Sequence, residues 1–222
     1  MTIALEVVAD ASAAARRVAE LVAERAREAV ASRGRFTLAV SGGATPGEMF
    51  RALGGEDVPW VETTVYQVDE RVVPAGHPDR NLTHLLAALP PAAHGSVHQI
   101  PVDDPDLERA AGRYAAELPA HLDLVHLGLG ADGHTASLVP GDPVLDVVDR
   151  LVALTNEYQG FRRMTLTFPA LENAREIVWL VTGKDKRDAL ARLLARDTSI
   201  PAGRISEPPQ RVVANAEAAP TP

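Results

Sequence analysis

The stretch LDLVHLGLGADGHTASLVPG, residues 122–141, joins an apolar run to a glycine-rich turn. Its first eight residues are typical of a strand that is covered on both faces of a parallel sheet. Gly128, Gly130 and Gly133 then have the G-x-G-x-x-G spacing of a dinucleotide-binding loop, and His134 follows directly. The stretch therefore indicates an α/β protein and leaves two hypotheses for the turn. It is either a nucleotide loop or a turn that presents a catalytic imidazole.

The residues around the glycines argue against the nucleotide loop. A dinucleotide fold needs a long helix after its glycines, but Pro140, Gly141 and Pro143 leave room for only two short turns. The G-x-G-x-x-G motif of a dinucleotide-binding fold also normally follows the first strand of that fold, whereas here it lies in the middle of the chain. We therefore interpret the turn as a device that places Asp132 and His134 at a strand end. A polar surface turn without a catalytic role is the alternative.

Strand and helix patterns alternate on both sides of this stretch. Apolar runs predict strands at residues 35–40, 63–68, 96–100, 122–129, 150–154, 163–168 and 176–183. Helical spacing predicts helices at residues 10–32, 46–53, 81–89, 105–118 and 186–196. Such alternation is typical of βαβ units, so we expect one domain over residues 1–222. Its fold is predicted to be an α/β three-layer sandwich with a mainly parallel, Rossmann-like sheet, and residues 215–222 a frayed tail.

The composition excludes several kinds of site and partner. The chain has 222 residues, a formal net charge of −8 and no cysteine. The acidic charge argues against nucleic-acid and anionic-membrane partners, and the lack of cysteine excludes disulfides and cysteine-bound metals. His94 and His98 have a metal-like spacing, but in an extended chain they would lie about 13 Å apart, so we expect no metal. With no signal-peptide pattern and no run of 18 apolar residues, we expect a cytoplasmic protein.

The loop SGGATPGE, residues 41–48, follows the strand at 35–40 and predicts an anion site. Gly42 and Gly43 let the backbone approach a ligand closely, and Thr45 is a good N-cap at the start of a capping box. The free N–H groups of such a helix start would face the strand ends, where ligands bind. No lysine follows the glycines, so a single phosphate fits better than ATP. An ordinary capped turn is the alternative.

Two further loops carry charge at strand ends. Asp69, Glu70 and Arg71 follow the strand at 63–68; they are costly to bury and either pair with one another or serve a site. Lys184 and Lys186 follow the strand at 176–183 and are the only lysines in the chain, whose other 20 basic residues are arginine. We interpret this as a flexible ammonium kept for a substrate phosphate, with chance as the alternative.

Five segments in order resemble the signature segments of the 6-phosphogluconolactonase family. They are LAVSGGATP, YQVDERVVPAGHPDRN, LGLGADGHTASLVPG, RRMTLTFPAL and LVTGKDK, and they run from about residue 38 to 190. The resemblance implies the fold shared with glucosamine-6-phosphate deaminase and ribose-5-phosphate isomerase. It also implies hydrolysis of 6-phospho-D-glucono-1,5-lactone to 6-phosphogluconate, the second step of the oxidative pentose phosphate pathway. No cofactor is implied, the partner is a small phosphorylated lactone, and we expect a monomer or small homo-oligomer.

The chemistry of a lactone fits these residues. A δ-lactone is already reactive, so a base that activates water suffices, and an imidazole is the usual choice. We assign this role to His134, as the resemblance also implies, and expect Arg71 or a glycine-turn N–H to stabilise the oxyanion. The phosphate is expected between residues 42–45 and Lys186, with Arg163 as a helper. The catalytic candidates are His134, Arg71 and Asp69. The substrate-binding candidates are Ser41, Gly42, Gly43, Thr45, Gly130, Asp132, Arg163 and Lys186.

The chain departs from the family pattern at a few positions, with Ala44 and Arg80 where serine is common and Val139 where phenylalanine is usual. The sister deaminase is one alternative, but its motif has a carboxylate where this chain has Val139, and D-E-Y in place of residues 69–71. A sugar-phosphate sensor of a transcription regulator is another. It would need a helix-turn-helix ahead of the strand at 35–40, and we expect too little chain there to hold one.

Overall fold

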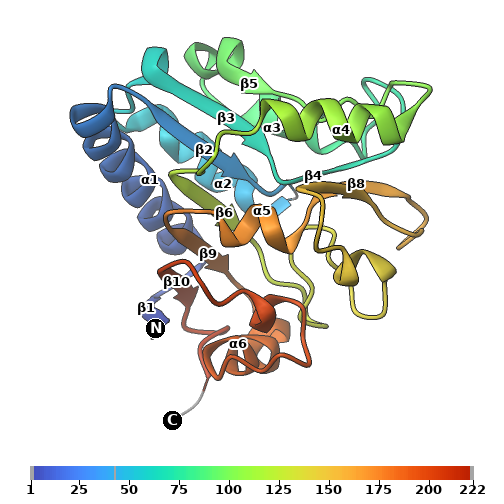
Figure 1. Cartoon of the computed structure of the whole chain (residues 1–222). Coiled ribbons are helices and arrows are strands. Elements are labelled where there is room, and N and C mark those ends of the chain that lie inside the picture. The colour runs from blue at the N-terminus through green and yellow to red at the C-terminus, as the bar shows by residue number, and fades with distance from the viewer. Residues whose placement is uncertain (1–2, 43, 221–222) are drawn as a thin grey trace.

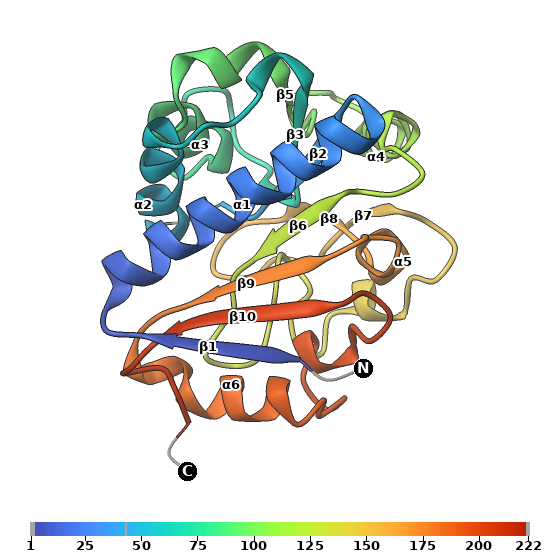
Figure 2. The ribbon, with the colours of Figure 1, turned by 90° about the vertical axis from the view of Figure 1, so that its left-hand side faces the viewer.

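The computed structural model describes residues 3–42 and 44–220, apart from the side chains of residues 44 and 45. A seven-stranded sheet crosses the molecule, and all of its strand pairings are parallel (Figures 1 and 2). In spatial order its strands are β1 (Ala4–Val8), β10 (Gln210–Asn215), β9 (Ile177–Val181), β6 (Leu124–Leu127), β2 (Phe36–Val40), β3 (Thr63–Gln67) and β5 (Val97–His98). The predicted parallel sheet is confirmed.

Helices cover both faces of this sheet and complete three layers (Figure 2). One face carries α1 (Ala11–Arg33), α2 (Ala44–Ala52) and α3 (Asn81–Ala88), and the other carries α4 (Leu107–Glu117), α5 (Phe168–Glu172) and α6 (Arg187–Leu194). Because side chains alternate along a strand, each strand feeds both cores. In β6, Leu124 belongs to the core under α1, whereas Val125 belongs to the core under α4.

The long helix α1 forms where its caps and its small apolar residues predict it. The Asp10 side chain accepts a hydrogen bond from the N–H of Ala13 at 2.7 Å, which caps the first turn. Gly34 ends the helix in the left-handed region with φ +71°, and its N–H donates to the Val30 carbonyl. No helix in the described ranges combines the length and the apolarity needed to cross a bilayer.

A second, smaller sheet differs from the sequence prediction. The strands expected at 150–154 and 163–168 form β7 (Val152–Leu154) and β8 (Arg163–Leu166), which do not extend the main sheet. Instead, β8 pairs antiparallel with both β7 and β4 (Asp69–Arg71). The five-residue α5 is the one α-helix between β6 and β9, so these strands lack the long crossover helix that a parallel pairing requires. This small sheet brings β4 and β8 to the carboxyl ends of the parallel strands (Figure 1).

The predicted frayed tail is wrong for residues 215–220, the part of it that the structure describes. Asn215 ends β10, and its side chain accepts hydrogen bonds from the N–H groups of Gly183 and Ala218. Ala218 is fully buried. The composition of this segment suggested a loose end, but a tertiary contact orders it. That contact also fixes the turn at Gly183, which precedes Lys186.

Candidate active site

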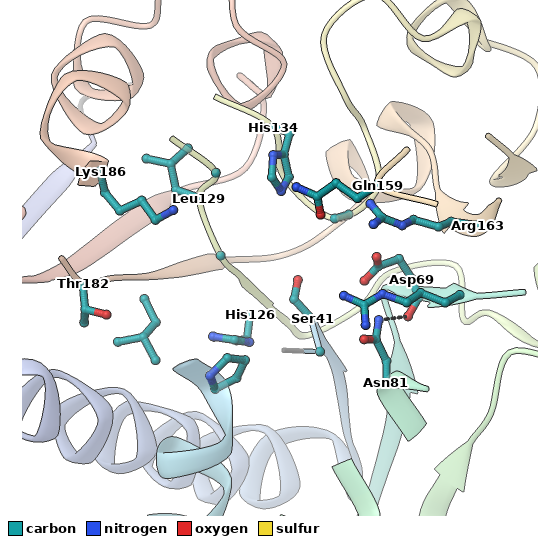
Figure 3. A pocket seen from close by; sticks show the side chains of 17 residues that line it. Ser41, Asp69, Asn81, His126, Leu129, His134, Gln159, Arg163, Thr182 and Lys186 are labelled. Carbon is teal, nitrogen blue, oxygen red and sulfur yellow. Dashed lines mark hydrogen bonds between the residues drawn. The ribbon is translucent and has the colours of Figure 1, made fainter. Parts of the chain in front are cut away.

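A cavity of about 240 Å³ lies at the carboxyl ends of the parallel strands, where α/β sheets generally bind ligands (Figure 3). Eight of the predicted site residues line it: Ser41, Gly42, Asp69, Arg71, Gly130, His134, Arg163 and Lys186. Gly43 lies outside the described residues, and so does the side chain of Thr45. Asp132 is not among the lining residues, but it contacts His134, which is.

His134 is held in place by Asp132. The imidazole Nδ1 lies 2.6 Å from Asp132 Oδ1, and the backbone N–H of His134 donates to the same oxygen at 3.1 Å. Burial opposes the ionisation of Asp132, but the His134 N–H, the imidazole and the Tyr158 hydroxyl together lower its pKa. An ionised Asp132 favours the tautomer with hydrogen on Nδ1, which leaves the Nε2 lone pair as the base. Asp132, which was predicted to bind substrate, instead orients the His134 imidazole.

The glycine spacing of residues 128–133 serves this imidazole. A Cβ atom on Gly130 would lie 2.1 Å from His134 Nδ1, so only glycine lets the ring fold back against the turn. The Gly130 N–H donates to the His134 carbonyl and the Gly133 N–H donates to the Gly130 carbonyl. Both of these N–H groups are engaged within the turn, so neither is free to donate to an oxyanion.

Asp69 lies buried in the wall of the cavity. Its Oδ2 accepts a hydrogen bond of 2.6 Å from the Ser137 hydroxyl. Burial raises the pKa of Asp69, while the Ser137 hydrogen bond and the charges of Arg163 and His134 act against this rise. A buried carboxyl group beside the Arg163 guanidinium is suited to accept a hydrogen bond from a sugar hydroxyl.

Two arginines face each other beside Asp69. Arg71 on β4 and Arg163 on β8 are directly opposite in the antiparallel register, a placement that costs stability for like charges. Their guanidinium groups lie over the rings of Phe161 at 5.4 Å and Tyr158 at 4.9 Å, respectively. Burial lowers the pKa of Arg163, although the charge of Asp69 opposes this. A pair of like charges at this position favours the binding of an anionic group.

The alternative of an ion pair among residues 69–71 is wrong. The Arg71 guanidinium donates to the carbonyl oxygen of Asp79 at 2.9 Å. Glu70 is fully buried and accepts hydrogen bonds from the N–H groups of Asn81 and Leu82, so it caps α3. Glu70 is therefore structural, whereas Arg71 and Asp69 face the cavity.

The start of α2 and Lys186 form the other side of the cavity. Figure 3 shows Lys186 and Thr182 on this side, and Asp69 and Arg163 on the opposite side. The Ser41 hydroxyl is buried and has no hydrogen-bond partner among the described residues. Arg163 lies beside Arg71 and Asp69, on the side of the cavity opposite Lys186 (Figure 3).

Two details of the α2 loop differ from the prediction or refine it. The helix begins at Ala44, so Thr45 lies within its first turn and is not the N-cap. A Cβ atom on Gly42 would lie 2.4 Å from Asn81 Cγ, so this glycine is required by the close approach of α3. The sequence had suggested that it makes room for a ligand.

Several lining residues were missed by the sequence reasoning. They include Asn81, His126, Leu129, Gln159 and Thr182. Asn81 is the last residue of the segment YQVDERVVPAGHPDRN and the first residue of α3, and this position next to the strand-end loop could have indicated that it lines the site. Gln159 lies in a segment between two strands of the small sheet, and no pattern in the sequence places it near His134. Within residues 3–42 and 44–220, no three His, Asp or Glu side chains cluster as metal ligands.

His126 carries a prediction about stability and pH. It is fully buried, neither ring nitrogen has a hydrogen-bond partner among the described residues, and burial lowers its pKa to about 4. In the unfolded chain an imidazole titrates near 6.5, so the unfolded state binds the extra proton first. The contribution of the neutral His126 to the free energy of unfolding is therefore complete above about pH 6.5. It decreases by about 3 kcal/mol as the pH falls from 6.5 to 4.

We expect His126→Leu to remove this contribution. Urea unfolding at pH 7.5 and pH 4.5 measures it, with the exposed His84→Leu as the matched control. Between pH 7.5 and pH 4.5 the free energy of unfolding decreases in both proteins. By the same linkage, this decrease should be about 2–3 kcal/mol smaller in His126→Leu than in wild type. An identical loss in wild type and both variants would show that His126 is not the neutral, buried group described.

Known proteins resemble this chain in sequence and in fold. The family model described as glucosamine-6-phosphate isomerases/6-phosphogluconolactonase matches residues 9–214. The chain is 38% identical over 175 residues to a 6-phosphogluconolactonase of Synechocystis sp., covering 72% of this chain and 71% of that protein. It is 35% identical over 209 residues to one of Nostoc sp., covering 86% and 85%. The crystal structure of 6-phosphogluconolactonase from Thermotoga maritima superposes with a TM-score of 0.86 at 26% identity, covering 96% and 99%.

Proposed function

Because this chain belongs to the glucosamine-6-phosphate isomerase/6-phosphogluconolactonase family, we propose that it hydrolyses 6-phospho-D-glucono-1,5-lactone to 6-phospho-D-gluconate. The observation that carries the proposal is the two-sided cavity. One side offers a carboxylate-held imidazole and two arginines, and the other offers Lys186 and the start of α2. A phosphorylated lactone has the complementary parts, an electrophilic carbonyl and a distant dianion.

The contacts of the phosphate group determine how the substrate lies in the cavity. The dianion lies between Lys186, the buried Ser41 hydroxyl and the N–H groups at the start of α2, all of which favour negative charge. The lactone ring then extends toward His134 and Asp69 on the opposite side (Figure 3). Because the phosphate is remote from the reacting carbon, its binding energy can orient the ring.

Hydrolysis follows from the groups around the carbonyl. The Nε2 atom of His134 takes a proton from water as the water oxygen forms a bond to C1. The resulting oxyanion is stabilised by Arg71, with the charge of Arg163 close by. The C1–O5 bond then breaks, and the imidazolium returns its proton to O5, which becomes the hydroxyl of the open-chain acid. Asp132 supports the imidazolium during this cycle.

The deaminase alternative lacks a matching residue in the structure. The position just before Pro140 at the end of the glycine turn is occupied by Val139, which is 7% exposed and apolar. A carboxylate needed there for sugar isomerisation is thus absent from this site.

We further propose that the reaction serves the oxidative pentose phosphate pathway in the cytoplasm, and that the protein acts as a monomer or small homo-oligomer.

A parallel assay tests the choice between the two reactions. The purified protein is incubated with freshly made 6-phosphogluconolactone, and separately with glucosamine 6-phosphate. We expect lactone loss above the spontaneous rate and no release of ammonia. Ammonia and fructose 6-phosphate from the second incubation, without lactone hydrolysis in the first, would replace the lactonase by a deaminase.

Arg71→Met tests the oxyanion role. Loss of one preorganised donor should lower kcat by about 10²-fold and change KM much less, because the charge develops mainly in the transition state. Steady-state kinetics on the lactone measure this, with Arg109→Met as the control because that arginine is well exposed and pairs with Asp104. If Arg71→Met keeps full activity but has a lowered melting temperature, the role of Arg71 would be to stabilise the fold through its contact with Asp79.

A further inference from the structure

A tight turn beside the cavity carries two aromatic residues. Tyr158 and Phe161 exchange backbone hydrogen bonds of 3.0 and 3.3 Å, and the two residues between them, Gln159 and Gly160, have φ values of +52° and +81°. Positive φ at both central positions is the type I′ geometry of two-residue hairpins. It is uncommon for glutamine, so the contacts around the turn must hold it.

Tyr158 touches both halves of the catalytic side of the cavity. Its hydroxyl donates to Asp132 Oδ2 at 3.2 Å, and its ring packs edge-on against the His134 imidazole, with centroids 5.7 Å apart. The face of the same ring supports the guanidinium of Arg163 at 4.9 Å. One side chain therefore contacts the carboxylate that orients the base, the base itself, and one of the two arginines.

A chain of hydrogen bonds sets the direction of the Tyr158 hydroxyl. The Gln159 side-chain amide donates to Tyr158 Oη at 3.3 Å, which directs the hydroxyl proton toward Asp132. Burial and the neighbouring Asp132 charge raise the pKa of Tyr158, so the hydroxyl remains a donor. Asp132 thus accepts a hydrogen bond from Tyr158 on Oδ2 and one from His134 on Oδ1.

Packing of the fold does not explain this placement. Tyr158 is only partly buried, Gln159 and Gly160 are exposed, and neither hydrophobic core of the described chain includes Tyr158. Besides Asp132 and His134, the charged and titratable groups that face this region include Asp69 and Arg71 on β4, Arg163 on β8, and His77, whose ring packs against Phe161. The contacts of Tyr158 are therefore directed at the site.

We propose that Tyr158 is a positioning residue: its hydroxyl fixes Asp132, and through it the tautomer and direction of His134, while its ring holds Arg163 in the cavity wall. This inference rests on the proposed lactonase reaction and adds to it a residue that acts through the base. The turn at Gln159 and Gly160 presents Tyr158 in the required direction.

The test uses Tyr158→Phe, which removes the hydroxyl and keeps the ring. We expect kcat on 6-phosphogluconolactone to fall about 10-fold, because the base loses alignment, with the melting temperature unchanged. Asp132 would then exert more of its charge on the imidazolium, so the acid limb of the kcat/KM profile should move up by about half a pH unit. Tyr66→Phe is the control, since that hydroxyl donates to the carbonyl of Glu117.

A second readout does not depend on turnover. The proton NMR signal of the hydrogen between His134 Nδ1 and Asp132, assigned by its loss in Asp132→Asn, should shift in Tyr158→Phe and stay in place in Tyr66→Phe. Wild-type kcat, pH profile and NMR signal in Tyr158→Phe would overturn the positioning role and leave the lactonase reaction intact. A lowered melting temperature with an unmoved pH profile and signal would also overturn it. If wild type does not hydrolyse the lactone, the reaction fails and the NMR arm alone decides whether Tyr158 holds the pair.

Discussion

His134→Ala is expected to lower kcat on the lactone by roughly 10²–10⁴-fold, the range for loss of a general base. The imidazole is held by Asp132 at 2.6 Å and lines the cavity beside two arginines. Its side chain is 27% exposed and its removal leaves the core intact, so the melting temperature should change little. Asp69, the other acid–base group in the wall, is engaged by Ser137 and cannot easily take over the role.

Kinetics of the purified variant measure the effect, with His84→Ala as the control because His84 is exposed on α3. Added free imidazole should restore part of the activity of His134→Ala and leave the control unchanged, since a small base can enter the space that the side chain vacated. A rate close to that of wild type without imidazole would show that His134 is not the base.

The second large effect concerns the phosphate. Unphosphorylated glucono-1,5-lactone should be a worse substrate by roughly 10²–10⁴-fold in kcat/KM. It loses two charge-assisted contacts of about 1.5–3 kcal/mol each, from Lys186 and from the start of α2. Lys186→Ala should therefore impair the phosphorylated lactone strongly and the plain lactone hardly at all.

The chain offers a matched control two residues away. Lys186 lines the cavity, whereas Lys184 is not among the described residues that line it, so Lys184→Ala should have a much smaller effect. Both lactones are compared with wild type and both lysine variants. An equal loss on the two substrates in Lys186→Ala would mean that the phosphate is bound elsewhere.

The parts of the fold that depend on local signals could be predicted from the sequence. Gly34 marks the end of α1 by capping, and the apolar runs mark five of the seven strands of the parallel sheet, whereas β1 and β10 were not predicted. Because parallel strands share one carboxyl end, the order of strands and helices was enough to assign the loops at 41–48, 68–81, 127–141 and 181–190 to one site. The cavity confirms that their residues meet.

The remaining features depend on tertiary pairing. Nothing local distinguishes β7 and β8 from strands of the main sheet, so the antiparallel partnership with β4 could not be predicted, nor could the meeting of Arg163 with Arg71. The contact of Tyr158 with Asp132 joins residues 26 positions apart. Asn215 likewise orders the C-terminal turn through Gly183, which a composition rich in alanine and proline conceals.

The glycine spacing at 128–133 shows how a motif can have a different physical cause. Gly130, the middle glycine of the spacing that would admit a pyrophosphate, is required here because a side chain on it would collide with His134 and Asp132. The distinction lies in what the glycine approaches. In this chain Gly130 approaches the His134 imidazole, and the N–H groups of Gly130 and Gly133 are bonded within the turn.

The most direct test of the account is the rate at which freshly generated 6-phosphogluconolactone disappears. The lactone is produced in the cuvette, and its loss is followed with wild type, with His134→Ala and without enzyme, at one pH and temperature. Lactonase activity predicts that wild type shortens the lifetime of the lactone far below the spontaneous value, while His134→Ala leaves it near that value. Loss of the lactone at the spontaneous rate in the presence of folded wild-type protein would contradict the account.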